Sequence, residues 1–293
     1  MSSIQFSIVI PTYDRAAFIE KTVASVLAQT VENFEIIIVD DGSTDNTGEI
    51  VAAIKDKRVS YYKKANEERA AARNYGTDRA HGRYVTCLDS DDIFYPDHLA
   101  VAVEMIEKNS EPEIFHLGYE VTGGDKGSYK MDHLPPIGNE ELIYGNQFAC
   151  RGIFLRADIA REHKFNPDRD LSATEDYELW LRLASRYPIR CDNRITSAII
   201  QHDERSVIST TPEKLIKRIE LAEKYLKADD AFMKRFGDKL GTIKSNLHLY
   251  VALHLALMKG HRGEVLRHLG IAVRLSPAAL RRTTFYGTLK HIV

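Results

Sequence analysis

The sequence contains few cysteines, and their spacing predicts no structural role for them. Cys87, Cys150 and Cys191 are odd in number and far apart, so they predict neither a disulfide framework nor a zinc site, and a reducing compartment is the simpler expectation. The chain also lacks an apolar run of the roughly 18 residues that a membrane span requires, and its N-terminus has no signal-peptide pattern. We therefore expect a protein that is made and kept in the cytoplasm.

An excess of charge of one sign is also absent. The chain has 40 Lys and Arg against 42 Asp and Glu, a formal charge of −2, so no overall field selects nucleic acid as a partner. Hydrophobic residues make up 44% of the 293 positions, which argues against disorder and allows one large domain or a domain with an appendage. One local exception is residues 259–293, which carry seven Lys or Arg and one Glu.

The first hundred residues alternate between two hydrophobic patterns. Continuous apolar runs, typical of strands buried on both faces, occur at 6–10, 36–39, 59–62 and 84–88. Helical spacing of apolar residues follows the first two runs, and a helix is predicted over 67–80. This alternation predicts a doubly wound α/β sheet, in which ligands bind beyond the carboxyl ends of the strands. Polar clusters at 11–15, 40–45 and 89–92 follow such ends, and we expect all three to meet in one cleft.

The most informative stretch is 84–92, a β-prone run that ends in the carboxylates Asp89, Asp91 and Asp92. Carboxylates this close repel one another, so a folded protein keeps them together mainly where a cation lies among them. Oxygen ligands without adjacent His or Cys suit Mg²⁺ or Mn²⁺, which commonly bridge a protein to phosphate oxygens. The alternative is a solvated acidic turn before the helix expected from about Pro96.

The pattern changes after residue 110. Glycines and the pair Pro135–Pro136 indicate loops and antiparallel strands over 111–205. A clear helix is predicted over 174–183, with the acidic residues Glu175 and Asp176 in its first turn, where acids also compensate the helix dipole. From Pro212 onward every segment has helical spacing.

Five segments together resemble the inverting glycosyltransferases of family 2. They are IVIPTYDR at 8–15, IVDDGSTD at 38–45, ARNYG at 72–76, LDSDD at 88–92 and TEDYELWLR at 174–182. They stand in the family's order and spacing, whereas the helical region from Pro212 lies outside the resemblance. The resemblance implies a GT-A fold with a mixed central sheet. It also implies a catalytic domain over 1–211, with a nucleotide-binding half at 1–110 and an acceptor half at 111–211, and a helical C-terminal region at 212–293.

By this resemblance, the base of a nucleotide-sugar donor lies across the first two strand ends. Asp41 is expected to accept the imide N–H of uracil, and Tyr13 to stack on the base, which makes a UDP-sugar the expected donor. Tyr13 could instead be a half-buried turn aromatic. The other positions expected to contact the donor are Pro11, Thr12, Asp14, Asp40, Arg73, Asp89 and Ser90. Asp40 could instead be a helix N-cap, and Arg73 an exposed helix arginine.

The remaining roles are also implied by the resemblance. Asp89 and Asp91, with His202, are expected to hold Mn²⁺ or Mg²⁺ on the diphosphate. His202 follows a β-like run at 196–200 and could equally be an edge histidine beside Asp203. Asp176 is expected to be the base that takes the proton from the acceptor hydroxyl. The acceptor is expected to be a glycan or a lipid-linked molecule. The basic C-terminal helices could touch an anionic membrane that carries it, or be a solvated or partner-binding face.

Three other functions are considered at this point. A sugar-nucleotide pyrophosphorylase has a glycine-rich, basic loop after its first strand, whereas residues 11–15 contain no glycine. A phosphate-receiver or phosphatase domain would need further Thr and Lys residues at later strand ends. A non-catalytic nucleotide- or glycan-binding module is disfavoured because carboxylates stand at both the metal and the base positions.

Overall fold

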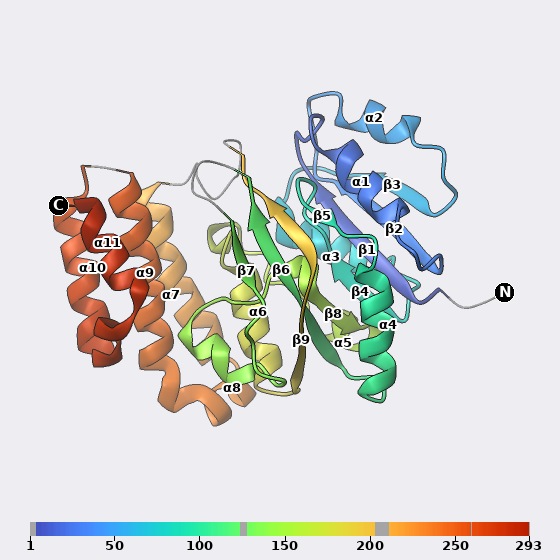
Figure 1. Ribbon diagram of the computed structural model, residues 1–293. Helices are drawn as coiled ribbons and strands as arrows, with labels where there is room; N and C mark the ends of the chain where they lie inside the picture. The colour runs from blue at the N-terminus through green and yellow to red at the C-terminus, as the bar shows by residue number, and fades with distance from the viewer. Residues whose placement is uncertain (1–3, 124–127, 203–210, 259, 293) are drawn as a thin grey trace.

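The centre of the molecule is a nine-stranded mixed sheet with the strand order β3-β2-β1-β4-β8-β6-β9-β5, and β7 pairs with β6 outside this path. The structure is a computed structural model that describes residues 4–123, 128–202, 211–258 and 260–292. Figure 1 shows the N-terminal strands at one end of the molecule and the C-terminal helices at the other. The expected fold class, an α/β fold with a mixed sheet and a helical C-terminal extension, is confirmed.

The first half of the sheet is parallel and follows the predicted alternation. Its strands are β1 (Phe6–Thr12), β2 (Phe34–Asp40), β3 (Val59–Lys63) and β4 (Tyr84–Cys87). The helices between them are α1 (Ile19–Leu27), α2 (Thr47–Ala53) and α3 (Glu68–Thr77). Because parallel strands end at the same edge, the polar segments after β1, β2 and β4 lie together.

Side chains that alternate along β1 enter two different cores, as expected for a strand covered on both faces. Ile8 and Ile10 pack in one cluster with α1 and with α4 (His98–Lys108). Val9 packs in the other cluster, with Ala72 of α3. Burial on both faces explains why β1 reads as a continuous apolar run.

The second half of the sheet contains the antiparallel pairs. Its strands are β5 (Ile93–Phe94), β6 (Ile114–Thr122), β7 (Tyr129–Met131), β8 (Ile153–Arg156) and β9 (Ile189–Ile200). β8 runs antiparallel to both β4 and β6, so β6 has the same direction as β4 and β8 is the inverted strand between them. The sequence pattern identified only 196–200 of β9. Its earlier part contains the polar residues Asp192, Asn193 and Arg194, where the register with β6 shifts beside Gly118.

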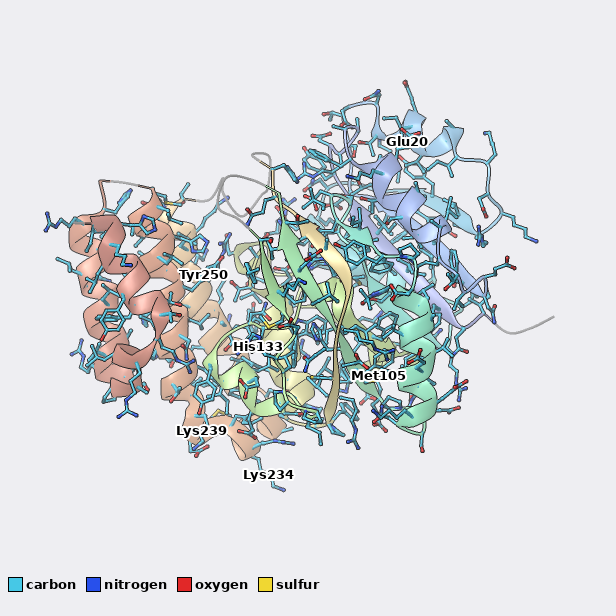
Figure 2. All side chains as sticks on the ribbon, viewed as in Figure 1. Glu20, Met105, His133, Lys234, Lys239 and Tyr250 are labelled. Carbon is cyan, nitrogen blue, oxygen red and sulfur yellow. The ribbon has the colours of Figure 1, made fainter. Side chains whose placement is uncertain are left out.

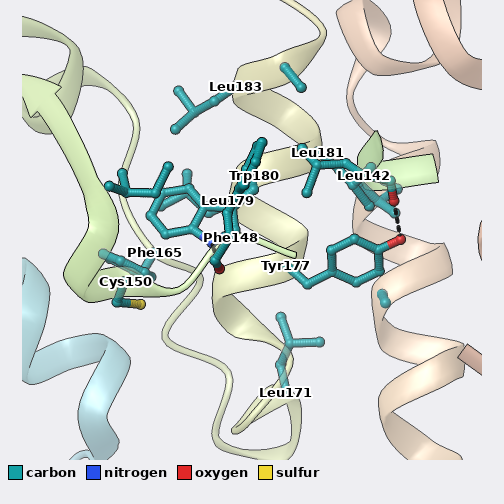
Figure 3. Close-up of a cluster of buried hydrophobic side chains, with 14 of the residues drawn as sticks. Leu142, Phe148, Cys150, Phe165, Leu171, Tyr177, Leu179, Trp180, Leu181 and Leu183 are labelled. Atoms are coloured by element: carbon teal, nitrogen blue, oxygen red, sulfur yellow. Dashed lines mark hydrogen bonds between the residues drawn. The ribbon is translucent and has the colours of Figure 1, made fainter. Parts of the chain in front are cut away.

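Helix α6 (Glu175–Ala184) is buried on most of its surface and is fixed by two side chains. The indole N–H of Trp180 donates to the carbonyl of Phe148 at 3.2 Å, and the hydroxyl of Tyr177 donates to the carbonyl of Leu142 at 2.5 Å (Figure 3). Leu142 belongs to the 3-10 helix η1 (Asn139–Tyr144). These anchors hold the N-terminus of α6, which carries Glu175 and Asp176, in a defined position.

The C-terminal region is helical, as predicted. Its α-helices are α7 (Pro212–Lys227), α8 (Asp230–Phe236), α9 (Leu240–Leu257), α10 (Arg262–Leu275) and α11 (Thr283–Ile292). Thr211 caps α7 by accepting from the backbone N–H of Lys214, and Pro212 occupies the first turn, as is usual at a helix start. α7 packs on α6, and α9 packs on η1. The expected boundary between residues 211 and 212 borders on residues outside the described ranges and stays a prediction.

Two expectations about the chain as a whole concern cysteines and membrane spans. Cys87, Cys150 and Cys191 are all free thiols. Within the described ranges, none of the helices combines the length and the apolar character needed to cross a membrane.

Candidate active site

The ends of β1, β2 and β4 surround a cavity of about 210 Å³. The structure brings together most of the residues predicted to bind the donor, because they lie on these three ends. The expected residues that line this cavity, here called the first cavity, are Pro11, Thr12, Tyr13, Asp41, Asp89, Ser90 and Asp91. The other lining residues are Arg15, Asn66, Glu68, Arg69 and Ala72.

Asp40 and Asp14 lie beside the first cavity but are not among its lining residues. Asp40 is fully buried and accepts hydrogen bonds from the backbone of Ser43 at 2.7 Å and from the hydroxyl of Tyr61 at 2.5 Å. Asp14 has a positive φ of 48° and accepts from the backbone N–H of Thr44 at 2.7 Å. Both carboxylates therefore shape the turn that carries Asp41. The N-cap of α2 is Asn46, so Asp40 is not the helix N-cap considered as its alternative.

Asp41 reaches the first cavity with a fixed orientation. Its carboxylate accepts from the ammonium group of Lys64 at 2.9 Å and from the backbone N–H of Glu67 at 3.0 Å, and the residue is 3% exposed. Tyr13, which follows the end of the neighbouring strand β1, is 45% exposed. The fixed carboxylate of Asp41 can accept a hydrogen bond from the edge of a flat base, and the accessible ring of Tyr13 can stack on the face of that base.

The three carboxylates after β4 have different environments. Asp92 is fully buried, pairs with Arg151 and accepts from the backbone N–H of Ile200 at 3.1 Å, so it holds the loop together. Asp91 has a carboxylate oxygen 3.0 Å from Nε2 of His202. The sequence could not separate these roles, because the partners come from residues 151, 200 and 202.

Asp89 lies between two guanidinium groups. Arg73 donates to it at 2.8 Å, and Arg151 lies 3.6 Å away. Burial acts to raise the pKa of Asp89, but the positive charges of Arg73 and Arg151 outweigh this effect and hold the pKa below its usual range. Asp89 therefore stays ionised at any physiological pH.

Arg73 is a buried bridge and not the exposed helix arginine considered as the alternative. It is 2% exposed, and its second guanidinium nitrogen donates to Glu175 at 2.7 Å. One side chain on α3 thereby joins the acidic loop after β4 to the N-terminus of α6. The helix that carries Asp176 is held against the donor-side carboxylates through this bridge.

Arg151 is a buried residue of the site that the sequence did not lead us to expect. It is 3% exposed within η2 (Cys150–Gly152), and its Nε and Nη1 atoms have no hydrogen-bond partner among the described residues. The available signal is a single charge inside the otherwise apolar run Phe148 to Phe154. A lone charge in such a run is rarely buried without a carboxylate partner, and here the partner is Asp92.

A second cavity of about 620 Å³ adjoins the first, because Asp89 and Arg69 line both. Asp176 lies in its wall and accepts from the side-chain amide of Asn146 at 3.0 Å. Burial and the negative charge of Glu175 raise the pKa of Asp176 to about 6, against the opposing effect of Arg73. A carboxylate with a pKa in this range can accept a proton near neutral pH.

Most other residues that line the second cavity lie outside the five family segments. Tyr119 and Tyr129 come from β6 and β7, Tyr250 from α9, and Arg282 from the segment before α11. Tyr250 lies on the side of α9 that faces the rest of the chain (Figure 2). Single aromatic and basic residues in separate elements give no local signal, so these positions were not predicted.

Few side chains in this part of the site could coordinate a divalent cation. Among the residues that the structure describes, no group of three His, Cys, Asp or Glu side chains could hold a metal ion by itself. Asp91 and His202 do lie together at 3.0 Å, and His202 stacks on Phe18 with 4.3 Å between ring centroids. One carboxylate and one imidazole fit a cation whose other ligands come from a diphosphate and water.

Comparison with known families gives an independent result. Residues 7–158 match the family model described as glycosyl transferase family 2, which is 152 of the 293 residues. The chain belongs to glycosyltransferase family 2. The resemblance stated from the five sequence segments is confirmed, and with it the enzyme class, a glycosyltransferase.

Relatives of this family-2 chain carry matching names. An uncharacterized glycosyltransferase of Rickettsia conorii is 44% identical over 200 residues, which cover 64% of this chain and 32% of that protein. An uncharacterized glycosyltransferase of Haemophilus influenzae is 32% identical over 185 residues, covering 60% and 70% respectively. The chain thus matches only about a third of the length of the first of these relatives.

Solved structures show the same fold. TarS residues 1–349 of S. aureus in complex with UDP-GlcNAc have a TM-score of 0.73 at 20% identity, covering 98% of this chain and 88% of that one. The mannosyltransferase PcManGT of Pyrobaculum calidifontis, in complex with GDP-Man and Mn²⁺, has a TM-score of 0.57 at 17% identity, covering 98% and 85%. At these identities the likeness establishes the GT-A fold alone.

Proposed function

We propose that this family-2 chain transfers a sugar from a UDP-sugar to a hydroxyl of a glycan or lipid-linked acceptor by one inverting displacement. The observation that carries the proposal is the junction of the two cavities at Asp89 and Arg69, with Asp176 in the wall of the second. A donor in the first cavity would have its reacting end at this junction. An acceptor in the second cavity would meet it there, beside a carboxylate suited to take a proton.

Recognition of uracil is assigned to Asp41 and Tyr13. A carboxylate accepts the imide N–H of uracil, and cytosine lacks that proton, so Asp41 would select uridine nucleotides. The hydrogen bonds from Lys64 and Glu67 keep this carboxylate in place without a ligand, which reduces the cost of ordering it on binding. The S. aureus neighbour was solved with UDP-GlcNAc, which agrees with a UDP-sugar as the donor class.

The diphosphate is assigned to the loop after β4 together with Mn²⁺ or Mg²⁺. Asp91 and His202 would hold the cation from the protein side, and Asp89 would stay oriented by Arg73 and Arg151. A bound divalent cation stabilises the negative charge that grows on the leaving diphosphate. The PcManGT neighbour was solved with Mn²⁺.

The catalytic base is assigned to Asp176. The acceptor oxygen forms a bond to the anomeric carbon as the bond from that carbon to the diphosphate oxygen breaks, and the hydroxyl proton passes to the carboxylate. One displacement from the face opposite the leaving group inverts the anomeric configuration. The raised pKa of Asp176 supports the assignment, since proton transfer is efficient when the pKa of the base lies near the working pH.

The division into a catalytic domain at 1–211 and a helical region at 212–293 belongs to the same proposal. A cytoplasmic site of action belongs to it as well.

A peripheral contact with an anionic membrane is proposed for α10 and α11. Leu266 and Tyr286 are 51% and 55% exposed on these helices, and Arg262, Arg267 and Lys290 accompany them. Exposed apolar side chains among basic ones favour binding to an anionic lipid surface.

The proposal is tested by incubating the full chain with individual UDP- and GDP-sugars and Mn²⁺ and measuring both the melting temperature and the release of nucleotide. The donor should raise the melting temperature, because a ligand stabilises the state that binds it. NMR of the product linkage should show a configuration opposite to that of the donor. Stabilisation by GDP-sugars alone would overturn the donor assignment, and a retained configuration would overturn the mechanism.

A further inference from the structure

The second cavity has a wall from the C-terminal helices, beyond the last of the five family segments. α9 contributes Asn246, Tyr250 and Leu253, and the start of α11 contributes Thr284, with Arg282 just before it. The family match ends at residue 158 and the family segments end at residue 182. This wall is therefore a feature of this chain that the family model does not describe.

The wall is tied to the helix that carries Asp176. Asn246 of α9 donates to the carbonyl of Ile143 in η1 at 3.1 Å, and the guanidinium of Arg282 lies 4.5 Å from the ring centroid of Tyr144. On its other side η1 receives the hydrogen bond from Tyr177 of α6. The η1 segment thus joins α6 to the C-terminal helices, and a group bound on this wall would lie at a fixed position relative to the base.

The charges in the second cavity are unevenly paired. Asp89 and Glu175 each accept from Arg73 at 2.8 and 2.7 Å. The side chain of Arg282, in contrast, makes no ion pair with any residue in the described part of the chain and contacts the ring of Tyr144 through a cation–π interaction. The residues named above from α9 and α11 include no acid, and the first turn of α11 has none either. A half-buried guanidinium beside the positive end of a helix favours an anion.

The second cavity also offers aromatic surface, from η1 and β7. Tyr144 is 44% exposed and Tyr129 is 54% exposed, and both line the second cavity. An exposed ring gives the apolar face of a sugar a flat surface on which to pack. Arg282 over the ring of Tyr144 places a cationic donor of hydrogen bonds next to that surface.

We infer that the wall formed by α9 and the start of α11 is an acceptor subsite for a saccharide that carries an anionic group, a phosphate or a carboxylate. Arg282 is its specificity-determining residue, because a guanidinium can bind such a group with two parallel hydrogen bonds. Tyr144 holds Arg282 in position and packs on the sugar, while the attacking hydroxyl lies at Asp176. This inference rests on the proposed function and deepens it by naming the class of acceptor.

The test is ligand-observed NMR on the full chain saturated with UDP and Mn²⁺, with glucose, glucose 6-phosphate and glucuronic acid as probes. At least one anionic sugar should bind more tightly than glucose. Arg282→Ala should weaken binding of that sugar by about 10- to 100-fold, because hydrogen bonds to charged groups are worth that much, and leave glucose binding unchanged. Arg282→Lys should keep part of the preference. Comparing the two anionic probes shows whether the subsite takes phosphate or carboxylate.

Arg281→Ala is the matched control, because Arg281 is exposed and outside the lining of the second cavity. It should leave the affinity for all probes unchanged. Equal affinity for the three sugars, or an anion preference that survives Arg282→Ala, would overturn the inference. A loss of UDP affinity in Arg282→Ala would place this arginine in the donor site and also overturn it. Failure of the parent chain to bind UDP would instead count against the proposed function.

Discussion

The two cavities are built in different ways. The first is lined by residues 11 to 91, mostly from the ends of neighbouring parallel strands and the loops that follow them, with the first turns of α3. The second is lined by residues 69 to 284, from α3, the strands β6, β7 and β9, the 3-10 helices η1 and η2, α6 and the C-terminal helices. Donor binding is thus assigned to a compact part of the sequence and acceptor binding to a dispersed one. The difference shows that a site built from one compact part of the chain can be recognised in short sequence segments, whereas a dispersed site depends on the tertiary packing.

The largest effect is expected on the acceptor side. Asp176→Asn should lower the rate of sugar transfer by about 10²- to 10⁴-fold, because only the proton acceptor has been removed. Initial rates with the donor identified by nucleotide release provide the measurement. Asp170→Asn is a suitable control, since Asp170 lies six residues earlier and lines neither cavity. Normal turnover by Asp176→Asn would place the base elsewhere.

The next effect is expected on the donor side and concerns the cation. Asp91→Asn should reduce the affinity for Mn²⁺ in the presence of UDP by about 100-fold or more, since even indirect partners of a metal ligand contribute 10- to 100-fold. Isothermal titration of UDP with and without Mn²⁺ measures the change. Asp97→Asn, an exposed position outside the first cavity, should behave like the parent. An unchanged metal dependence of UDP binding in Asp91→Asn would refute this assignment.

A smaller change is expected for base recognition. Asp41→Ala should weaken UDP binding by about 1.5–3 kcal/mol, the value of a hydrogen bond to a charged group, and should reduce the discrimination against cytidine nucleotides. Asp41→Asn keeps one acceptor oxygen and should lose less. Glu20→Ala is the surface control, because Glu20 is exposed on α1 (Figure 2). If Asp41→Ala keeps full affinity and selectivity, Asp41 has a structural role.

The smallest effect concerns stability and its pH dependence. The folded state raises the pKa of Asp176 from 3.8 to about 6, so this group favours the fold below its unfolded pKa and loses that contribution as the pH rises through about 6. Asp176→Asn should therefore gain on the order of 1–3 kcal/mol relative to the parent between pH 4 and pH 7. Urea unfolding at both pH values measures the gain. A constant difference at the two values would show that the carboxyl titrates normally.

The pH dependence of catalysis has the opposite sign. Asp176 must be deprotonated to accept a proton, so kcat/KM should rise with pH through about 6 and then level off. Rates measured from pH 5 to pH 8 with a saturating cation check this expectation. A profile that falls over this range would assign the titration to an acid.

The sequence predicted the first cavity better than the second for physical reasons. A buried parallel strand must be apolar throughout, so its polar end stands out, as at Asp41 and Asp89. The second cavity depends on long-range pairs such as Arg282 with Tyr144 and Asn246 with Ile143. Each of these residues is unremarkable in its own segment, and they meet only because α9 packs on η1 and α11 packs on α9.

Local sequence pattern also explains which elements of the fold were predicted and which were not. The helix over 174–183 was predicted, and the structure places the predicted acidic first turn, with Glu175 and Asp176, at the start of α6. The first part of β9 was not predicted, because polar residues at 192–194 interrupt its apolar pattern where the register shifts. Arg73 was recognised through its family segment, whereas Arg151 has the same buried pairing with a carboxylate but no segment that identifies it.

One set of UDP titrations tests most directly whether the first cavity binds the donor and the second cavity takes no part in donor binding. UDP affinity in the presence of Mn²⁺ is measured for the parent chain and for Asp41→Ala, Asp176→Asn and Arg282→Ala on matched preparations. The two-cavity account predicts a weaker affinity for Asp41→Ala alone, with the other two variants equal to the parent. An equal loss in Asp176→Asn or Arg282→Ala would contradict it, because the second cavity would then be part of the donor site.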